Sequence, residues 1–227
     1  DKHKNWYFLE HSNSHTVGRD FFVDSVRRMP FGNRKHPFMN TVTLFNYRHP
    51  LDILVSEANY YHIDGATTFS GWLSQHSFSE RIDRLLNDNW LLGSLRDRVG
   101  GFLPWLEFPN VIPLSYEELV GERGGGSAKD QHRLIWSLLL KLQAPGAPDE
   151  IASKLQREVS PTFRSGQIAN YIDCLPAEVI RNFAAQNQDI LRQFGYPLDG
   201  SFSLSTRRNN WLRKPLALST VECFQSI

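Results

Sequence analysis

Phe45-Asn-Tyr-Arg-His-Pro-Leu-Asp-Ile-Leu-Val-Ser56 is the stretch of sequence that decides the fold. The apolar run that leads into it, from Thr41 to Phe45, predicts a buried strand. Pro50 favours the first turn of a helix, where a missing N–H costs nothing, and Asp52 suits the positive end of that helix. The stretch therefore predicts a strand, a turn that carries an arginine, and a helix that carries a serine.

Arg48 and Ser56 are the candidate anion-binding residues of this stretch. A guanidinium group matches a phosphate or sulfate group with two parallel hydrogen bonds. Ser56 follows Arg48 by about two helical turns, which brings it within reach of the same anion if the turn folds back. An ordinary strand-to-helix turn has the same pattern, so other segments have to decide between the two interpretations.

The chain has the length and composition of one globular domain. It has 227 residues, of which 41% are hydrophobic and 12% aromatic, and its formal net charge is +1. This charge gives no broad basic surface for nucleic acid, so any anion site must be local. Cys174 and Cys223 lie far apart, without the spacing of a disulfide framework or a metal site. No apolar run reaches transmembrane length and no signal peptide is evident, so we expect a soluble cytoplasmic protein with no metal.

The pattern of expected elements is that of an α/β fold with a parallel β-sheet flanked by helices. A strand at 6–9, a helix at 19–29 and the strand at 41–45 form a βαβ unit. Further helices are expected at 51–61, 69–76, 78–86, 132–142, 149–158 and 176–194, and a further strand at 110–114. The glycine-rich segment 122–129 is expected to be a mobile loop. It lacks the Gly-Lys-Ser/Thr sequence of a nucleotide-binding P-loop.

Two later segments add candidate ligand-binding residues. Tyr116-Glu-Glu-Leu119 follows the expected strand at 110–114, and the segment 92–103, which carries Gly93, Ser94 and Phe102, precedes that strand. A tyrosine at the end of a parallel strand lies at the edge where α/β sheets bind ligands. Further on, Arg164-Ser165-Gly166 combines a second guanidinium with a glycine that permits close backbone approach.

Taken in order, the three segments resemble the PAPS-dependent sulfotransferases, and the resemblance spans roughly residues 40–197. It implies a P-loop nucleotide-transferase-like fold, with PAPS as co-substrate and PAP as product. By this resemblance Tyr116 contacts the adenine ring. The 3′-phosphate would be held by Arg48, Ser56, Arg164, Ser165 and Gly166. The family's usual lysine and tryptophan are replaced here by Ser165 and Tyr171.

The family's phosphate-sulfate loop, a Pro-Lys-Ser-Gly-Thr-Thr-like turn, has no counterpart in this sequence. We expect a single sulfotransferase-like domain over residues 1–227 that is incomplete at its N-terminus. A degenerate relative that has lost the loop is the alternative. A third option is that residues 12–16 replace the loop, although they lack its lysine and its glycine placement.

His11 and His15 are the candidates for the catalytic base. Many members of the family carry a histidine at the end of the strand that precedes the arginine strand, and the strand at 6–9 occupies that place. Histidine suits proton removal because its pKa lies near neutral pH. Glu10 is an outside candidate, since some sulfotransferases use glutamate.

The sequence thus predicts a sulfotransferase that moves a sulfuryl group from PAPS to a hydroxyl or amine acceptor. A non-catalytic module that binds PAP or another nucleotide is the alternative from a different class. A small nucleotide kinase is a third, which the absence of a Walker lysine opposes. The acceptor, a small molecule or a carbohydrate, is left open.

Overall fold

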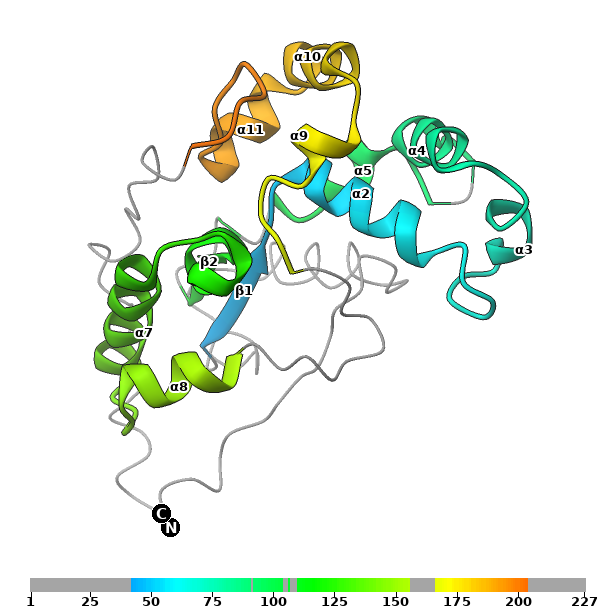
Figure 1. Ribbon diagram of the computed structural model, residues 1–227. Coiled ribbons are helices and arrows are strands. Elements are labelled where there is room, and N and C mark those ends of the chain that lie inside the picture. The colour runs from blue at the N-terminus through cyan, green and yellow to red at the C-terminus, as the bar shows by residue number, and fades with distance from the viewer. Residues whose placement is uncertain (1–41, 91, 104–105, 107–109, 156–165, 204–227) are drawn as a thin grey trace, which may run out of the picture.

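A two-stranded parallel sheet lies between two groups of helices in the computed structural model (Figure 1). The structure describes residues 42–90, 92–103, 106, 110–155 and 166–203. Within them the fold is mixed α/β and mostly helical. Strand β1 (Thr43–Tyr47) pairs with β2 (Val111–Ser115), and Tyr47 lies opposite Ser115 at their carboxyl ends. The parallel pairing agrees with the sequence prediction, and both strands begin later than predicted, at Thr43 and Val111.

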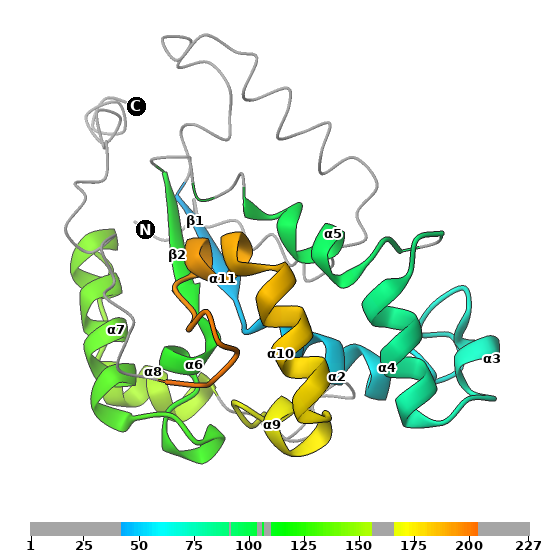
Figure 2. The ribbon, with the colours of Figure 1, turned by 90° about the horizontal axis from the view of Figure 1, so that it is seen from above.

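In chain order, four helices lie between the two strands, and the first of them, α2, follows β1 directly. These four helices are α2 (Pro50–Tyr60), α3 (Ser70–Leu73), α4 (Phe78–Asn87) and α5 (Leu95–Gly100). After β2 come α6 (Tyr116–Leu119), the 3-10 helix η3 (Glu122–Gly124), α7 (Ala128–Leu142), α8 (Pro148–Leu155), α9 (Tyr171–Cys174), α10 (Ala177–Gln186) and α11 (Gln188–Phe194). Helices α7 and α8 lie on one side of the strands. Helices α2, α4, α5, α10 and α11 lie on the opposite side (Figures 1 and 2).

Helix α2 forms where its sequence combines a cap, a proline and an apolar stripe. The Nδ1 atom of His49 accepts a hydrogen bond from the N–H of Leu51 at 3.3 Å, and Pro50 occupies the first turn. Leu51, Leu54, Val55 and Ala58 are buried and recur at helical spacing along one face. Each of the larger aliphatic side chains contributes roughly 1.5–3 kcal/mol by leaving water. This stripe is the centre of the main core.

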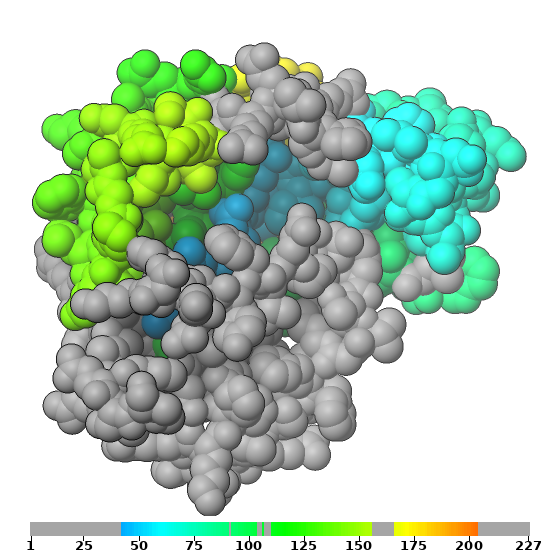
Figure 3. Space-filling model, turned by 90° about the horizontal axis from the view of Figure 1, so that it is seen from below, coloured from blue at the N-terminus to red at the C-terminus, as the bar shows by residue number. Residues whose placement is uncertain are grey.

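The two faces of the sheet pack against different helices. Phe45 and Tyr47 point to the main core, where Phe45 stacks on Phe102 at 5.9 Å and Tyr47 packs on Phe194 at 5.1 Å. On the other face, Ile112 and Leu114 pack against Leu134 and Leu138 of α7. Strand β1 (blue in Figure 3) lies at the surface between α7–α8 and α2–α4, and its Leu44 is 48% exposed.

The long helix predicted at 176–194 is wrong, because the chain breaks at Asn187 into α10 and α11. Asn187 has φ −128° and ψ 30°, and its side-chain amide donates to the carbonyl of Phe183 at 2.8 Å. Asparagine competes with the backbone for such hydrogen bonds, which favours a break over a continuous helix. Arg96 of α5 donates to Oδ1 of Asn187 at 3.0 Å and fixes the corner.

A buried ion pair between Arg98 and Glu57 ties α5 to α2. One guanidinium nitrogen of Arg98 donates to Glu57 Oε2 at 2.6 Å and to the carbonyl of Leu85 at 2.9 Å. Burial raises the pKa of Glu57, while the Arg98 charge opposes that shift. Because both side chains are buried, neither can replace its partner with water.

Replacing Arg98 with alanine is expected to lower the free energy of unfolding by about 3–5 kcal/mol, since it leaves a buried carboxylate without its cation. Chemical denaturation monitored by tryptophan fluorescence measures the loss. Asp189→Asn is the control, because it breaks the exposed pair of Arg96 and Asp189 and should change stability little. Equal effects of the two variants would contradict the structural role of the buried pair.

Candidate functional site

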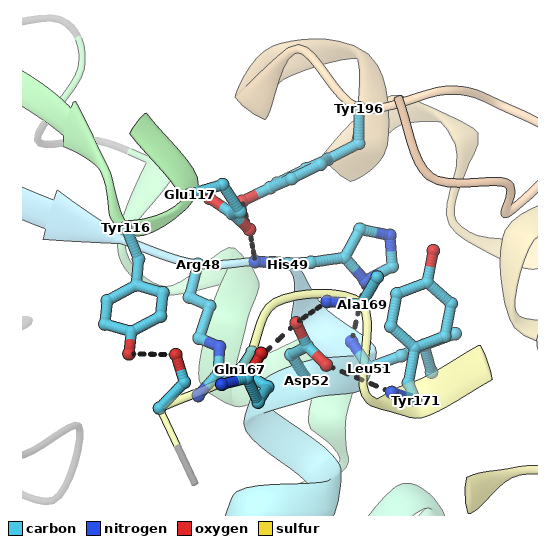
Figure 4. A network of polar contacts seen from close by, with 11 residues as sticks. Arg48, His49, Leu51, Asp52, Tyr116, Glu117, Gln167, Ala169, Tyr171 and Tyr196 are labelled. Carbon is cyan, nitrogen blue, oxygen red and sulfur yellow. Dashed lines mark hydrogen bonds and ion pairs between the residues drawn. The ribbon is translucent and has the colours of Figure 1, made fainter. Parts of the chain in front are cut away.

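Arg48 lies at the carboxyl end of β1, in the turn that leads to α2. Its Nη2 atom donates to the carbonyl of Gln167 at 2.6 Å and lies 3.4 Å from Oδ2 of Asp52. Its guanidinium carbon lies 4.7 Å from the centre of the Tyr116 ring. Figure 4 shows these groups converging from three separate segments of the chain. The side chain is 21% exposed, so it is partly reachable from solvent.

The Nε atom of Arg48 is buried and has no hydrogen-bond partner among the described residues. Buried donors without an acceptor are rare in folded proteins, because each costs a large part of the free energy of a hydrogen bond. An anion that binds to this guanidinium could supply the acceptor. The donor set fits a phosphate or sulfate group, and the role of Arg48 in binding one stays a prediction.

Tyr116 begins α6 directly after β2, so it lies at the same edge of the sheet as Arg48. Its hydroxyl donates to the carbonyl of Gly166 at 2.9 Å. Burial is the main cause that raises the pKa of Tyr116 above its usual value, and Arg48 opposes it. The hydroxyl thus stays protonated at neutral pH and acts as a donor.

The glycine-rich segment, predicted to be a mobile loop, forms η3 and the start of α7. It packs against the segment 166–169. The N–H of Ile168 donates to the carbonyl of Gly124 at 3.0 Å, and the side chain of Gln167 donates to the carbonyl of Arg123 at 2.8 Å. A Cβ atom on Gly124 would lie 2.7 Å from the oxygen of Gly166, so the approach requires glycine.

Asp52 joins α2 to the segment that carries Gly166. Its Oδ2 accepts from the N–H of Ala169 at 2.9 Å and its Oδ1 from the N–H of Tyr171 at 3.1 Å (Figure 4). Ala169 has φ 57°, a left-handed conformation that needs such support in a residue other than glycine. Burial raises the pKa of Asp52, against the lowering effect of Arg48 and the two backbone donors.

Glu117, in α6, holds the backbone of the turn that carries Arg48. Its Oε1 accepts from the N–H of His49 at 2.8 Å and from the hydroxyl of Tyr196 at 3.0 Å. The ring of His49 stacks on that of Tyr171, with their centres 4.3 Å apart. Since these residues are all buried, the backbone next to Arg48 is held on several sides.

The structure brings together three of the residues that the sequence predicted, Arg48, Tyr116 and Gly166. Ser56 lies on α2 one turn beyond Asp52, and its side chain is exposed. Its part in binding an anion stays a prediction. His11, His15, Arg164 and Ser165 lie outside the described residues.

Sequence reasoning missed the roles of Asp52 and Gln167. From the sequence, Asp52 is only an acidic residue that suits the first turn of a helix. Its bonds to Ala169 and Tyr171 span 117 and 119 residues, which no local pattern reveals. The available signal was its place four residues after Arg48, close enough for an ion pair between the turn and the first turn of α2.

Neither metal nor membrane features were found in the described part of the chain. It contains no group of three or more His, Cys, Asp or Glu side chains placed to hold a metal ion. None of its helices is long and apolar enough to cross a membrane.

Comparisons of the chain with protein-family models, curated proteins and solved structures found no match. The resemblance to sulfotransferases therefore rests on the residues themselves.

Replacing Asp52 with alanine is expected to lower the free energy of unfolding by about 2–5 kcal/mol, because two backbone donors lose their acceptor. Asp52→Asn keeps one acceptor oxygen and should cost less. Hydrogen exchange should accelerate at the amides of Ala169 and Tyr171. Asp173→Ala changes an exposed carboxylate of α9 and serves as the control. Unchanged exchange at both amides in Asp52→Ala would show that Asp52 does not hold this segment.

Proposed function

We propose that the protein is a PAPS-dependent sulfotransferase with a P-loop nucleotide-transferase-like fold. The observation that carries the proposal is the convergence of Arg48, Tyr116 and Gly166 at the carboxyl ends of the two parallel strands. This edge is where open α/β sheets bind nucleotides. The three residues are separated by 50 or more positions in the chain, so their meeting is not a consequence of local sequence.

The chemistry of the site supports a 3′-phosphate as its ligand. Arg48 provides a cation with a buried donor that lacks a partner in the described structure. Ser56 lies on the exposed surface of α2, the helix that follows the Arg48 turn, and its hydroxyl can donate to a phosphate oxygen. Arg164 and Ser165 precede Gly166 in the sequence and would add a second guanidinium and a second hydroxyl.

In the proposed reaction an acceptor oxygen or nitrogen attacks the sulfur atom of PAPS. The bond between sulfur and the oxygen of the 5′-phosphate breaks, PAP leaves, and a base takes the acceptor proton. As in phosphoryl transfer, the protein mainly aligns the reactants and neutralises charge. His11 or His15 would be the base.

A non-catalytic module that binds PAP is the second candidate. It is favoured by the described site residues, Arg48, Tyr116 and Gly166, whose contacts suit nucleotide binding and need no reaction to explain them. Such a module would keep the grip on the 3′-phosphate and lack the chemistry.

Adenosine 3′,5′-bisphosphate should bind more tightly than 5′-AMP, and calorimetric titration measures both. Arg48→Ala should remove most of this preference, roughly 10- to 100-fold, since charge-assisted hydrogen bonds contribute about 1.5–3 kcal/mol. Arg84→Ala is a matched control, because Arg84 also pairs with an aspartate and packs over an aromatic ring, away from the site. Equal affinity for the two nucleotides in the wild-type protein would refute a 3′-phosphate site.

Turnover separates the enzyme from the binding module. Release of PAP from PAPS should depend on an added acceptor, tested with phenols, sugars and amines. Of His11→Ala and His15→Ala, one should abolish release while leaving the affinity for the bisphosphate unchanged. Bisphosphate binding without turnover on any acceptor would favour the module.

A further inference from the structure

We propose that Asp52 competes with the bound anion for Arg48 and takes up a proton when that anion binds. Asp52 is then a positioning residue that also sets the pH dependence of the site. This inference rests on the anion site proposed at Arg48 and adds a property that the resemblance to sulfotransferases does not imply.

Arg48 already pairs with one negative group, Asp52, and the proposed anion would be a second. The side chain of Asp52 is fully buried, and its Oδ2 lies 3.4 Å from Nη2 of Arg48. An anion held by Arg48 therefore approaches a carboxylate that cannot turn away. Asp52 is fixed in place by the N–H groups of Ala169 and Tyr171.

The charges around Asp52 favour protonation of its carboxylate when an anion binds, rather than movement of the carboxylate away from Arg48. Among the described residues, three titratable side chains act on it: Arg48 in the turn before α2, and Tyr116 and Glu117 of α6. Arg48 is the only cation of the three. Glu117 is buried and adds to the negative potential at Asp52.

Anion binding should move the protonation equilibrium of Asp52 in one direction. Burial already raises its pKa, and the Arg48 charge is the largest effect that opposes this. A bound anion neutralises that charge and adds its own, so the pKa of Asp52 rises further. A pKa that is higher in the complex means that binding takes up a proton. The affinity is then greatest at low pH and falls as pH rises from the pKa of the free protein to that of the complex.

Asp52→Asn imitates the protonated carboxyl group. The two side chains have the same shape, and each offers one good acceptor oxygen to the backbone donors. The variant lacks the negative charge that competes for Arg48. We expect it to bind the anion at pH 8 at least as tightly as the wild-type protein binds it at low pH.

Sulfate is the right probe, because the second ionisation of a phosphate lies near pH 6 and would obscure the titration of the protein. Its dissociation constant is to be measured between pH 5 and pH 8 at constant ionic strength, on the wild type, Asp52→Asn and Asp189→Asn. Asp189 is a matched control, since it also pairs with an arginine, and its pKa of about 2 keeps it ionised over this range.

The wild type and Asp189→Asn should lose affinity as pH rises, by up to about tenfold per pH unit where one proton is linked. Asp52→Asn should show a flat profile. Histidines that titrate near pH 6.5 would weaken binding in all three proteins, so a pH dependence retained in Asp52→Asn overturns the inference. Loss of sulfate binding by Asp52→Asn at every pH also overturns it, and shows a purely structural role.

A measurement on the wild type alone guards against a variant that does not fold. Calorimetric titration with sulfate at pH 6, in buffers of different ionisation enthalpy, reports the number of protons taken up. Zero uptake by the wild type overturns the inference, and uptake supports it where Asp52→Asn shows none, because histidines can also take up protons. If adenosine 3′,5′-bisphosphate binds in preference to 5′-AMP and uptake is zero, only the inference fails. If neither nucleotide nor sulfate binds, the proposed anion site fails with it.

Discussion

The carboxylate of Asp52 is the constraint on which the candidate site depends. It holds the segment that carries Gly166 against the start of α2 through two backbone hydrogen bonds, and it faces the guanidinium of Arg48. The neighbouring Glu117 fixes the turn from the other side by accepting the N–H of His49. Two buried carboxylates therefore determine where the one partly exposed arginine of this turn can lie.

The elements that the sequence predicted well are those specified by adjacent residues. Helix α2 has its cap, its proline and its apolar stripe within a dozen positions, and it was placed within one residue of its bounds. The break at Asn187 was missed because the apolar spacing registers neither the hydrogen bond of Asn187 to Phe183 nor its hydrogen bond from Arg96, 91 residues away in the sequence. The apolar residues keep their helical spacing across the break, so this spacing alone predicts one continuous helix.

The same distinction holds for the candidate site. Arg48 and Tyr116 were predicted because each follows a strand, and parallel strands bring their carboxyl ends to one edge. The glycines of segment 122–129 suggested a mobile loop, and the structure gives the segment the 3-10 helix η3 and the first residues of α7. In the fold, Gly124 lies against Gly166, where any larger residue would collide with a carbonyl oxygen. The sequence around Gly124 does not show that Gly166 packs against it. That contact is the reason for a glycine at this position.

The contacts of Tyr116 also limit how a nucleotide base could be read. Its hydroxyl already donates to the carbonyl of Gly166, and Arg48 lies over its ring. If the ring contacts an adenine, it does so with its remaining aromatic surface and without a hydrogen bond from the hydroxyl. Stacking distinguishes poorly between bases, because every base has a π-face. In the proposed complex, selection of adenine over guanine would then come from other groups, and the contact of Tyr116 with Gly166 would link the base to the segment proposed to face the phosphate.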